Sequence, residues 1–418
     1  MKRRWKTGAL ALATGPLLAI PIAAFASCAT NSDERETSSE DASILLPDGN
    51  PAADAEVDVD AGPADAGCEP TDPGCTTEVV DCSTVDWCLV PTTVSPLNAL
   101  LAIWGTSNDD VWAVGSGGTI IHYDGTVWAP VPSGVQNTFF DIWGSGPNDI
   151  WVVSSTRLVL HGTGLQNGAA AWENVPTSLP EASETAVRAV WGSSASDVRI
   201  GSRGFTFQAA GKSYTGNQFL RTEYEDGGIG WRPIQGTETV TRYWASSPAD
   251  VWMTADNSTY APQERGKTLH GMPSDAGADA SPIADSLSWA PVDSQTNVTL
   301  LSIWGSSASD VWAVGGLGTI RHITPADERW QQVESKTIQP LRSVWGSGPN
   351  DIWVVGDGGT ILHYDGTAFA PATVQLPLGR KPNLRAVWGS GPNDVWVVGD
   401  GVVLHYTGPK PGKQAGSQ

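Results

Sequence analysis

The segment WGSGPNDIWVVGDGGTILHYDG, residues 345–366, returns almost unchanged as WGSGPNDVWVVGDG at residues 388–401. Looser copies precede it at spacings of about 39 to 60 residues, the range of four-stranded propeller blades. Each copy opens on a tryptophan, at Trp104, Trp143, Trp191, Trp244, Trp304, Trp345 and Trp388. The sequence therefore predicts an all-β chain of seven repeated blades.

Within each copy, short runs rich in Val, Ile and Trp alternate with Gly, Pro, Asn and Asp, and no segment has the apolar period of an amphipathic helix. The predicted strands read LRAVWG, VWVVG and TILHY in order, and a two-residue Asp-Gly turn such as 365–366 follows the third. A fourth strand then starts at an aromatic residue in the first six copies, at Trp128, Trp172, Trp231, Trp289, Trp330 and Phe369.

The seventh copy has no fourth strand of its own, whereas a strand of the same type, WCLVPTT from Trp87, precedes the first copy. We expect this strand to complete the last blade, because the pairing removes the two sheet edges that an open array would leave exposed. The prediction is a closed seven-bladed β-propeller over residues 83–408, followed by a disordered tail at 409–418.

Except for Trp5, the 20 tryptophans all fall on repeated strand positions. A periodic aromatic row can stack on sugars, but large aromatic side chains also supply most of the buried area between wedge-shaped sheets. We interpret the row as packing between blades. The one second-strand position that lacks its tryptophan is Arg199, where VRIG replaces VWVVG.

The N-terminus has the order of a secretory signal peptide, in which basic residues precede an apolar run at 9–25. The run is too short and too interrupted by proline to be read as a spanning helix. Two cleavage sites compete: AFA precedes Ser27, whereas FASC at 25–28 resembles a bacterial lipobox with lipidation at Cys28. We expect a signal peptide at 1–27.

Four further cysteines, Cys68, Cys75, Cys82 and Cys88, form an even set that an oxidising compartment would pair, in one of three ways. Cys28 is then the odd thiol, and its lipidation would leave none free, so we favour a lipoprotein over a free secreted protein. Zinc binding is disfavoured because the four lack C-x-x-C spacing. Any pairing that includes Cys88 would fasten the preceding segment to the closing strand.

Residues 28–82 are rich in Ala, Asp, Glu, Pro, Ser and Gly, which predicts a disordered acidic linker that carries the disulfide cysteines. Between Cys28 and Leu100 there are 16 acidic residues against Arg35 alone, so most of the net charge of −21 lies outside the repeats. The acidic run at 54–60 lacks the register of a calcium loop. The negative charge also argues against nucleic acid as a partner.

Histidines and aspartates recur with the repeat. Five of six histidines share one third-strand position, while His270 is assigned to an insertion; the five are His122, His161, His322, His363 and His405. Seven aspartates follow the opening tryptophans by six residues, at Asp110, Asp149, Asp197, Asp250, Asp310, Asp351 and Asp394. A residue repeated around a ring serves the ring, so we expect turn-stabilising carboxylates and neither a metal site nor a cofactor.

Four arginines depart from this regularity: Arg188, Arg242, Arg342 and Arg385 stand two or three residues before an opening tryptophan. In a propeller this position lies near one mouth of the central channel, where guanidinium groups can fork onto carboxylate or phosphate. These are the candidate ligand-binding residues. Pairing with neighbouring aspartates is the alternative interpretation.

The third and fourth repeats are longer than the others. The third contains Glu223, Glu225 and Asp226, which lie outside the periodic pattern and offer the carboxylates that sugar cleavage would need. The fourth carries an insertion at 263–282, whose second half resembles the linker and is expected to be a mobile loop.

The WGSxxxD[VI]WxVG repeat resembles that of bacterial secreted and lipoprotein β-propellers, and is distantly similar to photosystem-assembly-factor-like and sialidase-type repeat domains. The resemblance covers about three quarters of the chain and implies a fold more than a function. The sialidase likeness is the poorer one, because the SxDxGxxW box is absent.

We therefore expect a non-catalytic, cell-surface binding or protein-interaction propeller, anchored as an outer-membrane lipoprotein or secreted. Its partner would be a surface protein or a glycan, anionic glycans included, and the protein would be a monomer. The alternative is a carbohydrate-active enzyme, a glycoside hydrolase or lyase, that uses residues of the third and fourth repeats.

Overall fold

The computed structural model describes Cys68 and residues 71–166, 168–177, 186–209, 211–223, 228–256, 265–274 and 285–410. The expected signal peptide, Cys28, the linker up to residue 67 and the tail from residue 411 lie outside these ranges. In the described part of the chain, no helix is long and apolar enough to span a membrane.

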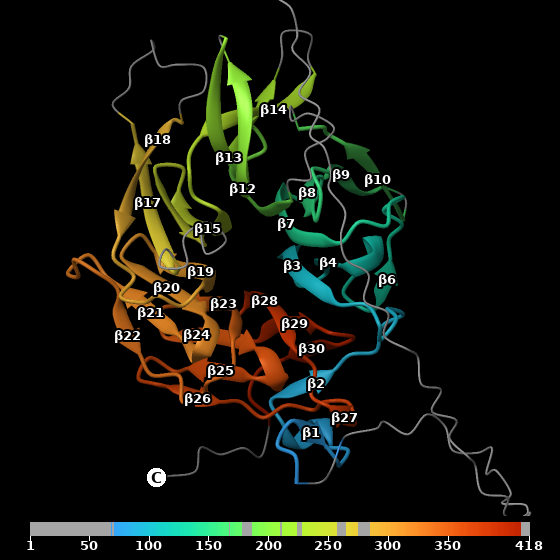
Figure 1. Cartoon of the computed structure of the whole chain (residues 1–418). Coiled ribbons are helices and arrows are strands. Elements are labelled where there is room, and N and C mark those ends of the chain that lie inside the picture. The colour runs from blue at the N-terminus through green and yellow to red at the C-terminus, as the bar shows by residue number, and fades with distance from the viewer. Residues whose placement is uncertain are drawn as a thin grey trace, which may run out of the picture. The chain divides into compact units, whose positions relative to one another are not determined.

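Seven four-stranded antiparallel sheets form a ring of blades (Figure 1). Blade 1 consists of β3 (Leu100–Ser107), β4 (Asp110–Gly115), β5 (Ile120–Tyr123) and β6 (Trp128–Pro130). Blade 2 consists of β7 (Phe139–Gly146), β8 (Asp149–Ser154), β9 (Val159–Gln166) and β10 (Ala169–Asn174). Blade 3 consists of β11 (Val187–Ser194), β12 (Asp197–Ala209), β13 (Lys212–Glu223) and β14 (Ile229–Gln235).

Blades 4 to 6 repeat the same meander. Their strands are β15 (Val240–Ser247), β16 (Asp250–Ala255), β17 (Lys267–Pro273), β18 (Leu287–Val292); β19 (Leu300–Ser307), β20 (Asp310–Gly315), β21 (Ile320–Ile323), β22 (Gln331–Val333); and β23 (Leu341–Gly348), β24 (Asp351–Gly356), β25 (Ile361–Tyr364), β26 (Phe369–Pro371). Four short 3-10 turns accompany the strands of the ring: η1 (Cys82–Thr84), η2 (Ser116–Gly118), η3 (Gly316–Gly318) and η4 (Asp357–Gly359).

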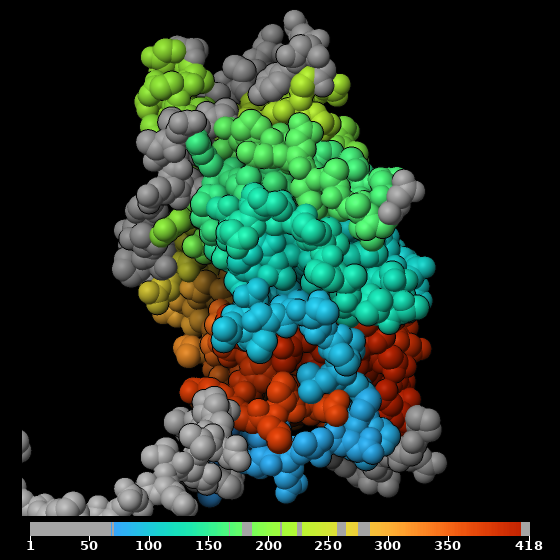
Figure 2. Space-filling model, turned by 90° about the vertical axis from the view of Figure 1, so that its right-hand side faces the viewer, coloured from blue at the N-terminus to red at the C-terminus, as the bar shows by residue number. Residues whose placement is uncertain are grey.

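Blade 7 contains strands from both ends of the described chain. It consists of β28 (Leu384–Gly391), β29 (Asp394–Gly399), β30 (Val403–Tyr406) and β2 (Trp87–Leu89). β2 pairs with β30 in antiparallel register, Trp87 opposite Tyr406, which confirms the predicted closing strand. Figure 2 shows the blue N-terminal segment lying against the red C-terminal blade.

The segment ahead of β2 is held to the rim of blades 6 and 7. β1 (Cys75–Thr76) pairs with β27 (Gly379–Arg380), which precedes the first strand of blade 7. Disulfides join Cys68 to Cys75 and Cys82 to Cys88. The second of them includes the closing strand and therefore fastens the preceding turn, η1, to the ring.

Aromatic contacts fill six of the seven seams between blades. The tryptophan of the second strand of one blade meets the fourth-strand aromatic of the next in an edge-to-face arrangement, with ring centroids 5.0 to 6.0 Å apart. The pairs are Trp112–Trp172, Trp151–Trp231, Trp252–Trp330, Trp312–Phe369, Trp353–Trp87 and Trp396–Trp128. The packing interpretation of the tryptophan row holds for these pairs.

The Trp-Gly dipeptide found in six of the seven first strands is a second contact between blades. A side chain carbon added at Gly346 would lie 2.7 Å from the Trp304 ring of the preceding blade, and one at Gly389 would lie 2.6 Å from Trp345. In these two blades the neighbouring indole occupies the space that a Cβ would take. Blade 4 carries Ala245 at this position.

Each repeated aspartate anchors a small polar cluster inside its blade. In six blades a histidine Nε2 lies 2.5 to 2.8 Å from the aspartate Oδ1 and its ring stacks on or tilts against the second-strand tryptophan. His270 belongs to this set: it lies on β17, bonds Asp250 and stacks on Trp252. Its assignment to an insertion was wrong, because part of the supposed loop, Lys267–Pro273, is the third strand of blade 4.

Two turn aspartates give the ring a defined acid sensitivity. Thr126 and backbone N–H groups donate to Asp124, and Thr367 and backbone N–H groups donate to Asp365, which lowers the pKa of each carboxyl from 3.8 to about 2. A depressed folded-state pKa adds stability above the unfolded value, and that stability is lost as the pH falls through the folded value. The relevant window therefore runs from pH 3.8 down to about 2.

We expect the melting temperature, followed by circular dichroism, to fall across this window. The double variant Asp124→Asn/Asp365→Asn should lose less over the same window, because amides do not titrate there. An equal fall in melting temperature in both proteins would contradict this origin of the acid sensitivity.

Candidate functional site

The two faces of the ring differ in chemistry. On one side of the ring, the first and third strands of each blade begin and the second and fourth strands end. We call this side the mouth face. The opposite side carries the Asp-rich turns. Four of the exposed large apolar side chains lie in loops of the mouth face: Leu97, Leu317, Ile338 and Leu378. The candidate arginines also lie there, since they stand at the starts of first strands.

Three of the four candidate arginines are neutralised by carboxylates. Arg342 binds Asp357 through Nε and Nη2 at 2.8 and 2.6 Å. Arg385 binds Asp400 in the same way at 2.9 and 3.0 Å. These two pairs match the alternative interpretation of the sequence, in which the arginines pair with neighbouring aspartates.

Arg242 reaches across blade 3. Its Nη1 lies 3.3 Å from Asp141 Oδ2 of blade 2 and donates to the Arg188 carbonyl at 3.2 Å. Blade 3 lies between these two blades and carries Ala189 at the position that Asp141 has in blade 2 and Arg242 has in blade 4. Burial raises the pKa of Asp141, although the charge of Arg242 opposes this shift. Arg242 therefore does not offer a free cation.

Arg188 is the exception among the four. Blades 6 and 7 place an aspartate fifteen residues after the arginine, whereas blade 3 places Arg203 fifteen residues after Arg188. Among the described residues the Arg188 guanidinium forms no hydrogen bond or ion pair, and it lies over the Phe140 ring at 5.6 Å from the centroid. Loss of solvation and the like charge of Arg203 lower the pKa of Arg188, while Asp256 opposes the shift.

A long hairpin stands beside this arginine pair. β12 and β13 continue past the first strand of their blade, with Phe205 opposite Gly216 and Ala209 opposite Lys212 (Figure 1). The sequence marked repeat three as lengthened, and the additional residues form this ribbon. Phe205 stacks on Phe219 at 4.5 Å, so the base of the hairpin is fixed to the blade core.

The seam between blades 3 and 4 is polar where the other six are aromatic. Arg199 replaces the second-strand tryptophan, is 2 % exposed, and donates from Nη1 to both Asp285 oxygens at 2.7 and 2.9 Å. Asp285 of blade 4 also accepts the Trp289 indole N–H at 2.8 Å. An ion pair thus stands where other seams hold two aromatic rings.

A second buried hydrogen bond crosses the same seam. Tyr243 of β15 donates to Gln218 of β13 at 2.9 Å, and both residues are buried. Gly201 makes room for this contact, because a Cβ there would lie 3.0 Å from the Tyr243 hydroxyl. Burial raises the pKa of Tyr243 above its ordinary range, which keeps the phenol protonated and able to donate.

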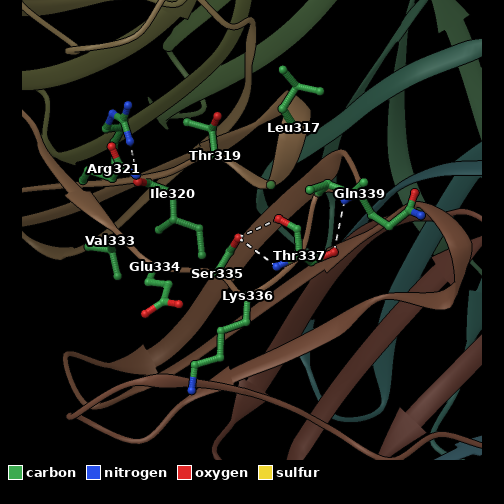
Figure 3. A pocket seen from close by; sticks show the side chains of 13 residues that line it. Leu317, Thr319, Ile320, Arg321, Val333, Glu334, Ser335, Lys336, Thr337 and Gln339 are labelled. Atoms are coloured by element: carbon green, nitrogen blue, oxygen red, sulfur yellow. Dashed lines mark hydrogen bonds between the residues drawn. The ribbon is translucent and has the colours of Figure 1, made fainter.

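Pockets recur at one repeat position on the mouth face, beside the loop that follows the fourth strand. Those of blades 5 and 1 have volumes of about 650 and 540 Å³. In blade 5 the lining groups bond one another: Ser335 donates to the Thr337 carbonyl, Gln339 N donates to Thr337 Oγ1, and Arg321 Nη1 donates to the Ile320 carbonyl (Figure 3). Leu317, at φ 53°, and Ile338 stand exposed at its rim.

The pocket of blade 4 is larger, about 760 Å³, and reaches into blade 3. We call it the seam groove. Its blade 3 side includes Asn217, Gln218 and Gly236, and its blade 4 side includes Met253, Leu269, Trp289 and Thr296. It carries both an apolar wall and a polar one, as ligand sites commonly do.

Of the three carboxylates proposed for sugar cleavage, the structure describes only Glu223. Glu223 is exposed at the end of β13, and Glu225 and Asp226 lie outside the described residues. Among the described residues, no group of three or more His, Cys, Asp or Glu side chains is placed to hold a metal ion.

No protein-family model and no curated protein matches the chain. Solved structures do match it. The structure of YCF48 bound to D1 peptide shares 17 % identity at a TM-score of 0.54, over 80 % of this chain and 100 % of that one. YCF48 from Cyanidioschyzon merolae shares 18 % identity at a TM-score of 0.55, over 77 % and 98 %.

A catalytically inactive virginiamycin B lyase from Staphylococcus aureus with quinupristin shares 12 % identity at a TM-score of 0.52, over 77 % of this chain and 99 % of that one. At such identities the likeness is one of fold. The chain is an all-β seven-bladed propeller, structurally similar to YCF48 and to this lyase.

Proposed function

We propose that the protein is a non-catalytic binding module that presents its mouth face to a protein partner, with Arg188 receiving a carboxylate of that partner. The observation that carries the proposal is the Arg188–Arg203 pair, which occupies the positions where blades 6 and 7 place an arginine and an aspartate. A cation without an ion-pair partner, next to a like charge, gains from binding an anion.

Three further observations support this face as the interface. Four exposed aliphatic side chains lie in its loops and offer apolar contact to a partner. The β12–β13 hairpin gives it a raised edge beside Arg188. A structurally similar propeller, YCF48, has been solved bound to D1 peptide, so a propeller of this shape binds a peptide.

The proposal includes an acidic tether. The described chain leaves the ring at the rim of blades 6 and 7, where β1 pairs with β27 and Lys381 donates to Pro73 and Gly74 carbonyls. This rim lies across the ring from blade 3. An acidic linker that starts at a lipidated Cys28 would tether the ring in the cell envelope, where a surface protein is the proposed partner; an acidic glycan is the other anion that fits.

The expected result concerns an array of peptides with free C-terminal carboxylates and their amidated copies. The protein should retain a subset of the free acids, and Arg188→Ala should weaken that binding about tenfold or more, the value of a charge-assisted hydrogen bond. Arg385→Ala is the matched control, because Asp400 already occupies that guanidinium.

Two outcomes would count against the proposal. Equal loss of peptide binding in Arg188→Ala and Arg385→Ala would show that the peptide carboxylate does not bind specifically at Arg188. On a parallel array of acidic glycans, retention of a glycan while no peptide is retained, with loss on Arg188→Ala, would keep the anion site and replace the protein partner by a glycan.

A further inference from the structure

Every first strand carries one extra residue near its start on the mouth face. In blade 1, Leu100 and Ala102 lie opposite consecutive residues of β4, so Leu101 between them has no residue opposite it. The first strands of the other six blades shift register at the same position. A bulge of this kind turns the extra side chain out of the regular alternation. We call these seven residues the bulge ring: Leu101, Phe140, Arg188, Thr241, Leu301, Arg342 and Arg385.

The bulge ring varies in chemistry where the rest of the first strand is constant. The residue before each ring member is apolar and at most 1 % exposed, because it packs in the core of its blade. Each ring member itself is partly or fully exposed, and the residue types range from leucine and phenylalanine to threonine and arginine. First strands of neighbouring blades contact one another, so the ring members of neighbouring blades are neighbours as well. The ring can therefore change its chemistry without a change in the blade cores.

Three members of the bulge ring already have polar partners. Arg342 and Arg385 bind aspartates of their own blades, as described above. The Thr241 hydroxyl lies 2.7 Å from the hydroxyl of Thr254 and donates to the Leu300 carbonyl at 3.3 Å. Blades 4, 6 and 7 thus satisfy their own ring side chains.

The three consecutive members from blades 1 to 3 combine apolar surface with a cation. Leu101 and Phe140 are half-buried apolar side chains. The Arg188 guanidinium has no hydrogen-bond or ion-pair partner within the part of the chain that the structure describes, and its central carbon lies 5.6 Å from the centroid of the Phe140 ring. A ligand that satisfies both groups must therefore carry an anion and an apolar group on the same residue or on adjacent residues.

The C-terminal residue of a protein meets this requirement. Its α-carboxylate and its side chain are bonded to the same carbon, and the carboxylate can accept two N–H donors of one guanidinium. An aspartate or glutamate inside a chain carries its carboxylate on the side chain, and polar peptide groups flank that residue on both sides. The α-carboxylate of an apolar residue is thus the anion that uses both the cation and the apolar surface.

We propose that the bulge ring binds the C-terminal residue of the protein partner. Arg188 donates to the α-carboxylate, and Phe140 and Leu101 contact an apolar side chain of the same residue, a leucine or a phenylalanine. This binding mode rests on the proposed function, because it uses the same Arg188 site. It adds which part of the partner is bound, and it assigns Phe140 and Leu101 as specificity-determining residues.

Fluorescence anisotropy on the full chain measures the binding of four decapeptides labelled with fluorescein at the N-terminus. They share a body of glycine and serine and end in leucine, phenylalanine or serine as the free acid, or in leucine as the amide. The leucine and phenylalanine acids should bind. The leucine amide should bind about tenfold more weakly, since it loses a charge-assisted hydrogen bond, and the serine acid about fivefold more weakly, since it loses apolar contact.

Leu101 and Leu301 supply a matched pair of variants. Both are half-buried leucines of the bulge ring and both belong to blades two removed from that of Arg188, but only Leu101 lies on the Phe140 side. Phe140→Ala should reduce the preference for the leucine acid over the serine acid to less than about twofold, and Phe140→Leu should restore most of it. Leu101→Ala should reduce the preference by a smaller factor, whereas Leu301→Ala should leave it unchanged.

The preference is a ratio of two affinities, so a loss of folded protein does not change it. A preference that is the same in Phe140→Ala and in the unaltered protein overturns the binding mode, and the proposed function stands if Arg188→Ala still weakens the acids about tenfold. Equal binding of the leucine acid and its amide, or no binding of any acid, also overturns it, while the peptide array still decides the proposed function. If Arg188→Ala binds the leucine acid as well as the unaltered protein does, both proposals fail.

Discussion

Replacing Trp87 by alanine is expected to lower the free energy of unfolding by about 3 to 5 kcal/mol, the cost of removing a large aromatic side chain from a core. Trp87 is fully buried and its ring lies 5.0 Å from Trp353 and 5.6 Å from Tyr406. The loss is large because this one side chain packs the closing strand against blade 7 and also fills the seam with blade 6.

Urea denaturation followed by circular dichroism measures the effect. Val79→Ala is the control within the same N-terminal segment, since that side chain is 77 % exposed and its truncation should be nearly neutral. A change below about 1 kcal/mol for Trp87→Ala would show that the closing of the ring does not depend on the packing of this side chain.

Replacing Asp285 by alanine is expected to cost about 3 to 5 kcal/mol, because it leaves the Arg199 charge buried without its partner. Arg199 is 2 % exposed, and its Nη1 donates to both Asp285 oxygens. The double variant Arg199→Leu/Asp285→Leu should recover most of that loss, since well-packed apolar residues often replace a buried ion pair without net cost.

Asp400→Ala is the comparison variant at the mouth. Its pair with Arg385 is partly exposed, at 26 % and 33 %, so the expected cost is only about 0 to 1 kcal/mol. Thermal and urea unfolding of the four proteins gives the comparison. A double variant no more stable than Asp285→Ala would show that the seam needs its polarity to keep the blades together.

The periodic part of the fold was predictable because each copy of the repeat has the same sequence pattern. The seven blades and the placement of the strand from Trp87 in the last blade followed from counting strands, and both are confirmed. His270 was misplaced because the longer spacing in repeat four hid the register of its third strand. Its distance from Trp252 and Asp250 in space is that of the other five histidines from their partners.

The contacts that distinguish blade 3 from the other blades could not be predicted from any single copy of the repeat. Arg199 stood out as the missing tryptophan, but its partner Asp285 lies 86 residues away, next to a segment without repeat features. Aligned copies do contain a signal: Tyr243 occupies a position where other blades carry Ile or Val, and Arg203 one where blades 6 and 7 carry Asp. The disulfide pairing had no such signal, since three pairings were open.

Pairing Trp87 with Tyr406 joins strands separated by more than three hundred residues, and this fixes an order of events during folding. During synthesis β2 is made before any of the seven blades, and its partner β30 only after the other six are complete. Contacts of such long range are slow to form. The bridge between Cys82 and Cys88 spans only six positions and needs no blade at all, so it can shape the waiting strand early. Oxidation would then come first and ring closure last, with β30 exposing an unpaired edge in the interval.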